Sequence, residues 1–326
     1  MMTRSLPGKD QLTICFAHPA YRMAERFALR ATGIRHFEVR NLADLQARVG
    51  EAEVVVVSGL WRNEFIESAP RLAFIQSISA GTDQYGKPAL EAAGIRLASA
   101  QGSNERAVAE HAIALVMAMA RKIPMARDNQ AAGKWRGLIS EIAQREDELG
   151  GKTLVIVGMG RIGSRLATLA RAFDMRVIAV KRDPTRGAEA ADSVVGQDRL
   201  LAVLPEADFV ALTCPLTPET ENLIDEKALA AMKPSAYLVN VARGPVVNQE
   251  ALVAALEQGR LAGAALDCVR EEPLPQSSPL WRVDNLLITP HTAGETRRYE
   301  DNVIDLLMEN LNRQWRGQAQ LKNEIV

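Results

Sequence analysis

The sequence contains little of what marks secreted, membrane-bound or nucleic-acid-binding proteins. Only three of its 326 residues are cysteine, and Cys15, Cys214 and Cys268 are widely spaced. So few thiols, odd in number, argue against a disulfide framework and indicate a reducing compartment, the cytoplasm. Lysine and arginine number 39 against 40 aspartates and glutamates, mixed along the chain without a basic stripe. This balance argues against nucleic acid or an anionic membrane surface as a partner.

Long hydrophobic runs are also missing. The longest uninterrupted apolar run, residues 112–120, is about half as long as a membrane-spanning helix. Residues 1–10 lack the apolar core of a signal peptide, and we expect them to form a loose end. The length allows two domains with separate cores, so the sequence predicts a soluble globular protein.

What is present is an alternation of short apolar runs with helical patterns. Several of the runs are apolar throughout and rich in valine and isoleucine, as strands buried on both faces must be. The runs cover residues 12–16, 54–58, 74–77, 154–157, 177–180, 209–214, 236–242, 263–266 and 286–290. The alternation predicts the α/β class with doubly wound parallel sheets.

One predicted helix, residues 104–123, is apolar on most of its circumference and is expected to stop at Pro124. Such a helix must be covered on nearly all sides, so we expect it at a domain junction or a subunit interface. We expect residues 103–294 to form one domain. Residues 1–102 form the other, to which the last helix, 298–315, returns with the segment 295–326.

A glycine-rich turn follows the run at 154–157. Gly158, Gly160 and Gly163 match the G-x-G-x-x-G pattern between a strand and a helix. In that pattern the first glycine permits the tight turn and the second lets the backbone approach a pyrophosphate. The third allows close packing of helix and strand, and the helix amino end receives the phosphates. Because strand, glycines, helix and next strand occur in order, the pattern predicts a dinucleotide site.

The end of the next strand bears on the choice of cofactor. An NAD site usually has an acidic residue there, which bonds the ribose hydroxyls. This chain has Lys181 and Arg182, cations that attract a 2′-phosphate, followed by Asp183. The sequence therefore favours NADP, and NAD remains the alternative if Asp183 turns back toward the ribose.

Polar residues follow three later strand-like runs. Arg243 follows the run at 236–242, Asp267 follows 263–266 and His291 follows 286–290, while Glu272 lies between the last two. Ligands of open parallel sheets bind outside the carboxyl ends of the strands, so these side chains are expected to face one crevice. An arginine to hold a carboxylate and a histidine to move a proton suit hydride chemistry on a carboxylate-bearing substrate.

Four motifs together resemble the D-2-hydroxyacid dehydrogenase family. They are GMGRIG at 158–163, VNVARGP at 239–245, LDCVREEP at 266–273 and TPHTAG at 289–294. The resemblance extends to residues 104–121, to Trp135 and to PLTPET at 215–220, whereas in the first domain only SAGTD at 79–83 matches. It implies a Rossmann cofactor domain inserted into a flavodoxin-like substrate domain, and a homodimer.

The resemblance also implies roles for individual residues. Arg243 would bind the carboxylate of a 2-oxo acid, and His291 would be the general acid in reduction. Glu272, selected over Glu271 by its spacing to Pro273, would hydrogen-bond the imidazole. Substrate contacts would come from Ser79, Ala80 and Gly81, together with Arg243 and His291. The cofactor would contact Gly158, Gly160, Arg161, Ile162, Gly163, Lys181, Arg182, Cys214, Pro215, Thr220, Val241, Ala242, Asp267, Ala293 and Gly294.

Other enzyme classes fit the sequence less well. None of the four tyrosines has the lysine four positions later that short-chain dehydrogenases need, and formate-oxidising relatives carry glutamine at the position of Glu272. Cysteines and histidines lack metal-ligand spacing, so no metal is expected. The remaining histidines, among them His111 in the apolar helix, are interpreted as structural.

Two alternatives stay open. One is a nicotinamide-sensing, corepressor-like binding protein with little turnover, and the other is an NAD-dependent phosphoglycerate-type dehydrogenase. We favour an NADPH-dependent oxidoreductase that reduces a small 2-oxo acid, such as glyoxylate or hydroxypyruvate, to the D-2-hydroxy acid.

Overall fold

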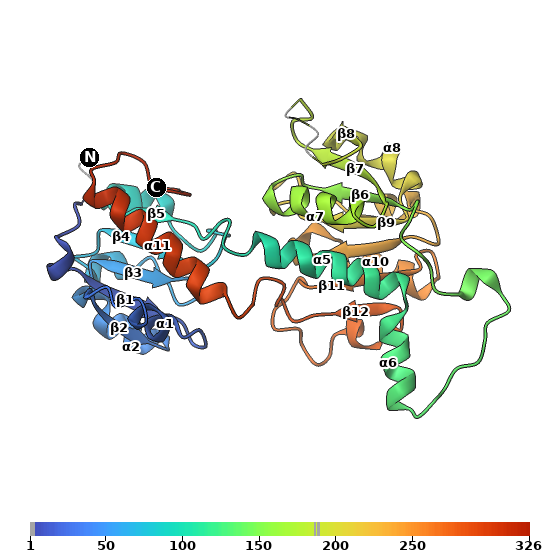
Figure 1. The fold of residues 1–326 in the computed structure, drawn as a ribbon, viewed down its shortest axis with the longest axis horizontal. Coiled ribbons are helices and arrows are strands. Elements are labelled where there is room, and N and C mark those ends of the chain that lie inside the picture. Colours follow the sequence, from blue (N-terminus) through green and yellow to red (C-terminus); the bar gives the residue numbers. More distant parts are fainter. Residues whose placement is uncertain (1–3, 186, 188–189) are drawn as a thin grey trace. The chain divides into compact units, whose positions relative to one another are not determined.

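The computed structural model describes residues 4–185, 187 and 190–326, and its chain divides into two compact units. Unit 1 consists of the chain up to Asn104 together with Glu295–Val326, and unit 2 is Glu105–Gly294 (Figure 1). Each unit is built around its own parallel sheet. The predicted α/β class is therefore confirmed.

The sheet of unit 1 has five parallel strands in the order β2-β1-β3-β4-β5. This is the flavodoxin-like order. The strands are β1 (Thr13–Ala17), β2 (Arg35–Val39), β3 (Val54–Val57), β4 (Phe74–Ser77) and β5 (Arg96–Ala98). The helices are α1 (Met23–Ala28), α2 (Leu42–Arg48), α3 (Phe65–Ser68), α4 (Lys87–Ala92) and α11 (Tyr299–Trp315).

Strand β1 shows why both faces of this sheet are covered. Ile14 and Phe16 point to a core that also contains residues of α1 and α11, whereas Cys15 and Ala17 point to a second core with α2, α3 and α4. Because side chains alternate along a strand, a strand buried on both faces must be apolar at successive positions. The continuous run at 12–16 therefore identified the strand correctly.

The sheet of unit 2 has seven parallel strands in the order β12-β11-β10-β9-β6-β7-β8. Chain order reverses between β6 and β9, as in the Rossmann fold. The strands are β6 (Thr153–Val157), β7 (Arg176–Lys181), β8 (Ser193–Gly196), β9 (Phe209–Leu212), β10 (Tyr237–Asn240), β11 (Gly263–Leu266) and β12 (Leu286–Ile288). The helices are α5 (Glu105–Ala120), α6 (Ile123–Ala131), α7 (Arg161–Arg171), α8 (Leu200–Val203), α9 (Glu226–Ala231) and α10 (Gln249–Glu257).

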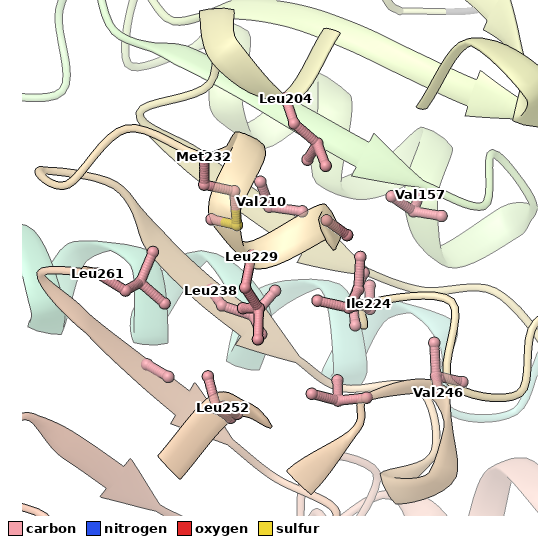
Figure 2. Packing of buried hydrophobic residues seen from close by; sticks show 14 of the residues in the cluster. Val157, Leu204, Val210, Ile224, Leu229, Met232, Leu238, Val246, Leu252 and Leu261 are labelled. Carbon is pink, nitrogen blue, oxygen red and sulfur yellow. The ribbon is translucent and has the colours of Figure 1, made fainter. Parts of the chain in front are cut away.

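Two cores also enclose this sheet. Figure 2 shows part of one of them, in which Val157 and Val210 lie with Leu229 and Leu252 from helices α9 and α10. Helices α5 and α7 pack on the other face, so α5 is covered within unit 2, where it contacts α7, β10 and β11. That packing accounts for the apolar circumference from which we expected a junction or interface. Within the described residues no helix is long and apolar enough to cross a membrane.

Three strands and two chain segments differ from the sequence-based prediction. The missed strands β2 and β8 lie at sheet edges, and β5 has only three residues, so none has a continuous apolar run. The predicted helix 104–123 ends at Ala120, because Lys122 adopts a left-handed conformation and Pro124 occupies the first turn of a new helix, α6. Proline fits a first helical turn, where its missing N–H is not needed.

The prediction of a loose end at residues 1–10 is wrong from Arg4 onward. Residues 1–3 lie outside the described part of the chain. From Arg4 onward the segment is held, because the Arg4 amide donates to the Gly94 carbonyl at 2.9 Å and its guanidinium donates to the Leu72 carbonyl at 2.8 Å.

Candidate functional site

The glycine turn after β6 has the geometry that its sequence predicts. Gly158 has a φ of +101°, and a Cβ there would lie 2.5 Å from the backbone nitrogen of Cys214. A Cβ on Gly163, in the first turn of α7, would lie 2.2 Å from the Gly158 carbonyl oxygen. Only glycine therefore permits the left-handed turn and the close approach of α7 to β6.

Gly160 serves a different purpose, since it faces open space. Apart from Gly160 itself and its two chain neighbours, no heavy atom of the described chain lies within 4 Å of the point that a Cβ would occupy there. Gly160 is the N-cap of α7, whose first amides are free of intrahelical partners and favour an anion. The residues present thus fit the pyrophosphate of a dinucleotide.

A cavity of about 600 Å³ opens beside this turn. Seven of the predicted cofactor residues line it: Gly158, Gly160, Lys181, Arg182, Cys214, Pro215 and Thr220. Asp183, Gln197 and Leu223 also line it. The Thr220 hydroxyl holds the wall, because it accepts from the Thr217 amide at 2.7 Å and donates to the Pro215 carbonyl at 2.7 Å.

The other predicted cofactor residues lie outside that lining. Arg161 and Ile162 begin α7 with Gly163, and Ile162 packs against the core below. Val241 and Ala242 are buried directly after β10, and Ala293 is buried in the turn after His291 with Gly294 beside it. Val241, Ala242, Ala293 and Gly294 thus follow the carboxyl ends of β10 and β12.

The charged residues at the end of β7 are engaged with the following loop. The Lys181 ammonium donates to the Gly187 carbonyl at 2.9 Å. One carboxylate oxygen of Asp183 accepts from the Thr185 hydroxyl at 2.6 Å and from the Thr185 amide at 3.1 Å. Both side chains therefore border the cavity while holding the loop beside it.

Glu272 and His291 form a close pair. Nδ1 of His291 lies 2.6 Å from one Glu272 carboxylate oxygen, and the other oxygen accepts from the Val269 amide at 3.0 Å. The hydrogen bond to Glu272 raises the pKa of His291 against the opposing effect of burial, and the charge of Asp267 adds to the increase. Burial disfavours ionised Glu272, but the hydrogen bonds from His291 and Val269 prevail and lower its pKa. The pair therefore favours imidazolium beside carboxylate.

Asp267 shapes the turn that carries His291. His291 has a φ of +56°, which is uncommon for a residue other than glycine. The buried Asp267 carboxylate accepts from the amides of Thr292 and Ala293, at 3.0 and 3.1 Å, and from the Thr289 hydroxyl at 2.7 Å. The carboxylate thus anchors both sides of the strained residue.

Arg243 lies on an extended backbone after β10, with its guanidinium donating to the Ala242 carbonyl at 2.7 Å. Its loop is fastened by Asn240, which is fully buried. The Asn240 side chain donates to the Arg243 carbonyl at 3.0 Å and accepts from the Ala242 amide at 3.0 Å. The positive charge of Arg243 lowers the pKa of His291 in part, so the two side chains influence each other electrostatically.

The predicted substrate loop belongs to unit 1 and follows β4. The Ser79 hydroxyl lies 2.7 Å from the Ser58 hydroxyl and donates to the Gly81 carbonyl at 3.0 Å. Ala80 and Gly81 are half-buried, so the loop has a defined shape with part of its backbone accessible. It offers hydroxyls and amides rather than charges.

Sequence reasoning missed three residues of this site. Asn240 lies inside an apolar run, where a buried side-chain amide indicates hydrogen bonds to the backbone of the following turn. Gln197, directly after β8, lines the cavity. His111 was interpreted as structural, yet its Nε2 lies 3.0 Å from the Thr289 hydroxyl. Nothing in the sequence indicates that contact, because it joins residues that are 178 positions apart.

Comparison with known proteins agrees with this geometry. Residues 113–293 match the family model described as the D-isomer specific 2-hydroxyacid dehydrogenase, NAD binding domain. A glyoxylate reductase of Thermofilum pendens is 37% identical over 76% of this chain and 73% of its own length. A glyoxylate/hydroxypyruvate reductase B of Yersinia enterocolitica is 36% identical over 83% of each chain.

Two further similarities show how broad the relationship is. A D-3-phosphoglycerate dehydrogenase of a Synechocystis species is 38% identical over 74% of this chain but only 42% of its own length. A crystal structure of a D-isomer specific 2-hydroxyacid dehydrogenase family protein from Aeromonas salmonicida matches 97% of this chain and 99% of that chain. The TM-score of this match is 0.84 and the identity 29%. The chain therefore belongs to the D-isomer specific 2-hydroxyacid dehydrogenase family and is an NAD(P)-dependent oxidoreductase.

Proposed function

We propose that this protein reduces a small 2-oxo acid of the glyoxylate or hydroxypyruvate type to the D-2-hydroxy acid, using NADPH. The observation that carries the proposal is the Glu272–His291 pair, in which a carboxylate 2.6 Å from the imidazole raises the pKa of His291 and so favours its protonated form. The names of the two reductases to which this chain is similar support the substrate class.

The roles follow from the contacts. When bound, the nicotinamide cofactor supplies the hydride that adds to the carbonyl carbon. Because Nδ1 of His291 faces Glu272, Nε2 is the nitrogen that gives its proton to the carbonyl oxygen. Arg243 binds the substrate carboxylate, for which the planar guanidinium offers paired donors. In the reverse direction His291 accepts the proton as a base.

We assign substrate binding in unit 1 to the Ser79–Gly81 loop. Its accessible amides suit a carboxylate, since successive backbone N–H groups in a loop form a cradle for anions. Unit 1 is thus the substrate domain and unit 2 the cofactor domain. The three buried, unpaired cysteines suit the reducing cytoplasm as the place of action.

A panel of 2-oxo acids assayed with NADPH and with NADH tests the proposal. We expect the highest kcat/KM with glyoxylate or hydroxypyruvate. Preference for 3-phosphohydroxypyruvate with NADH would support the phosphoglycerate-type alternative. The similarity to the Synechocystis D-3-phosphoglycerate dehydrogenase is the reason to test it. Negligible turnover with every acid, despite tight cofactor binding, would support a nicotinamide sensor.

The preference for NADPH rests on the residues that border the cavity at the end of β7. Lys181 and Arg182 bring two positive charges to the place where an adenine ribose lies in this fold. The Asp183 oxygen that accepts both Thr185 donors is directed into the loop. The bond from Lys181 to the Gly187 carbonyl uses one of the three donors of the ammonium.

Lys181→Asp tests this assignment. Charge-assisted contacts are worth about 1.5–3 kcal/mol each, so we expect wild-type enzyme to prefer NADPH by at least about tenfold. The variant loses an attraction and gains a repulsion, and most of the preference should disappear while kcat with NADH persists. Added salt should weaken NADPH binding more than NADH binding. Equal or better use of NADH by the wild type at low salt would assign the ribose to Asp183.

We also propose a homodimer in which the segment after α6 contacts a second copy. Figure 1 shows α6 and this segment projecting from the seven-stranded sheet of unit 2. Trp135, Leu138 and Ile142 are 98%, 102% and 75% exposed, which is unusual for large apolar side chains. Sedimentation of the wild type and of Trp135→Ser/Leu138→Ser tests this surface, since only the variant should be monomeric.

A further inference from the structure

The turn that carries His291 is held by a chain of side chains that extends to helix α5. Asp267 accepts from the two amides that follow His291, and also from the Thr289 hydroxyl. The Thr289 hydroxyl in turn lies 3.0 Å from Nε2 of His111, a half-buried residue of α5. All four residues belong to unit 2.

The direction of each hydrogen bond follows from the chemistry of the groups. An ionised carboxylate only accepts, so the Thr289 proton points to Asp267 at 2.7 Å. The Thr289 oxygen then accepts, and His111 must carry its proton on Nε2 to donate. The same Nε2 is 3.5 Å from the nearer Asp267 oxygen, so the N–H also faces the buried negative charge.

The need for such a chain lies in the backbone of His291. At a φ of +56° the residue is in a conformation that side chains other than glycine adopt only where the surroundings enforce it. Thr289 precedes the strained residue and its amide donates to the Leu266 carbonyl at 2.9 Å, while Thr292 and Ala293 follow it. Asp267 bonds to groups on both sides of His291. It can hold the turn in this conformation only if the Asp267 carboxylate is itself held in one orientation.

We infer that His111 and Thr289 are positioning residues for the proton transfer: through Asp267 they hold His291 against Glu272. This inference rests on the proposed role of His291 as the proton donor. His111 is then not a structural residue of an apolar helix. It connects the helix that enters unit 2 to the imidazole that reacts, although it touches neither substrate nor reacting atoms.

Thr289→Val tests the chain with almost no change in side-chain volume. We expect kcat to fall roughly five- to tenfold, as for one lost hydrogen bond, while the KM for the 2-oxo acid and the Kd for NADPH stay near wild type. The upper pH limit of kcat should also move to lower pH, because His291 would be held less closely to Glu272 and Asp267. Thr289→Ser keeps the hydroxyl and should restore both properties.

His111→Leu should reproduce the effect of Thr289→Val, and His111→Gln, which retains a donor, should recover part of kcat. Residues of one chain are coupled, so the double variant Thr289→Val/His111→Leu should be no slower than either single variant. Thr168→Val is the matched control, since this exposed threonine of α7 also donates from its hydroxyl, to the Ser164 carbonyl at 3.1 Å.

Four outcomes would contradict the inference or the proposed function. Wild-type kcat and pH profile in Thr289→Val and His111→Leu would overturn the inference, as would losses that multiply in the double variant. His291→Gln is run beside them: if it lost turnover while Thr289→Val did not, only the positioning chain would fail. If His291→Gln itself kept turnover, the proposed function would fail instead.

Discussion

Two histidines follow parallel strands in the two units, yet their surroundings make them opposites. His18 comes directly after β1 in unit 1, and its Nδ1 accepts from the amides of Ala20 and Tyr21 at 3.1 and 2.8 Å. His291 follows β12 in unit 2, and its Nδ1 faces the carboxylate of Glu272. Burial lowers the pKa of His18, whereas the hydrogen bond to Glu272 raises that of His291.

The comparison shows that burial and hydrogen-bond partners, rather than a position after a parallel strand, decide the chemistry of an imidazole. Burial is the main cause of the lowered pKa of His18, and the two amide bonds to Nδ1 act in the same direction, because they are lost when that nitrogen is protonated. An imidazole beside a carboxylate is stabilised in its protonated form, which suits a proton donor. The same contrast applies to the carboxyl ends of the strands in the two sheets. Those of unit 1 carry serine hydroxyls, whereas those of unit 2 carry charged side chains.

The largest expected effect comes from exchanging each histidine for glutamine. His291→Gln should lower kcat by about 10²–10⁴-fold, the usual contribution of general acid catalysis, while NADPH binding stays intact. His18→Gln keeps an oxygen to accept the two amides and should leave kcat close to wild type. Steady-state kinetics on both variants measures the difference, and similar losses in the two would remove the distinction between them.

Arg243 is expected to come next. Arg243→Ala removes the hydrogen bonds to the substrate carboxylate. We expect kcat/KM to fall by the factor that corresponds to a loss of about 2–4 kcal/mol of transition-state stabilisation. Arg243→Lys keeps the charge without the paired donors and should lose less. Unchanged catalytic efficiency of Arg243→Ala would show that the substrate carboxylate does not bind to Arg243.

A smaller effect is predicted for the pH dependence of Glu272→Gln. The hydrogen bond to Glu272 is the largest cause of the raised pKa of His291, so its loss lowers that pKa. Reduction requires protonated His291, and the rate should therefore fall away at a lower pH than in the wild type. A pH–rate profile of kcat from acid to alkaline pH measures the shift, and an unmoved profile would separate Glu272 from the proton donor.

The smallest effect is expected in stability, where the two histidines act with opposite sign. The pKa of His18 is lowered in the folded state, so its contribution is present above the unfolded pKa and is lost as the pH falls from that value through the lower folded pKa. The pKa of His291 is raised, so its contribution is present in acid and is lost as the pH rises through the folded value. Denaturant unfolding at several pH values should show His18→Gln reducing the acid sensitivity, and His291→Gln increasing it.

The sequence predicted the site residues of unit 2 much better than it predicted the surroundings of His18 in unit 1. The glycine turn could be located because Gly158 and Gly163 are required by steric contacts that no other residue satisfies. The proximity of Glu272 and His291 could be expected, since both follow neighbouring strands at one sheet edge. Edge strands β2 and β8 were missed because partial exposure replaces the apolar run with mixed residues.

What the sequence could not provide are contacts made by distant elements. The bond between His111 and Thr289 depends on how α5 crosses the sheet, and no local pattern encodes it. The two amides bound by His18 likewise depend on the backbone turn after β1, so only the structure distinguishes a neutral imidazole from a reactive one.

Titration of the imidazoles by NMR tests the account most directly, because the chain contains only four histidines. His18→Gln and His291→Gln assign the two signals by their disappearance. We predict that His291 titrates above an ordinary histidine and moves down in Glu272→Gln, whereas His18 titrates below and does not move. A His291 signal that titrates at or below that of His18 would contradict the assignment of His291 as the proton donor.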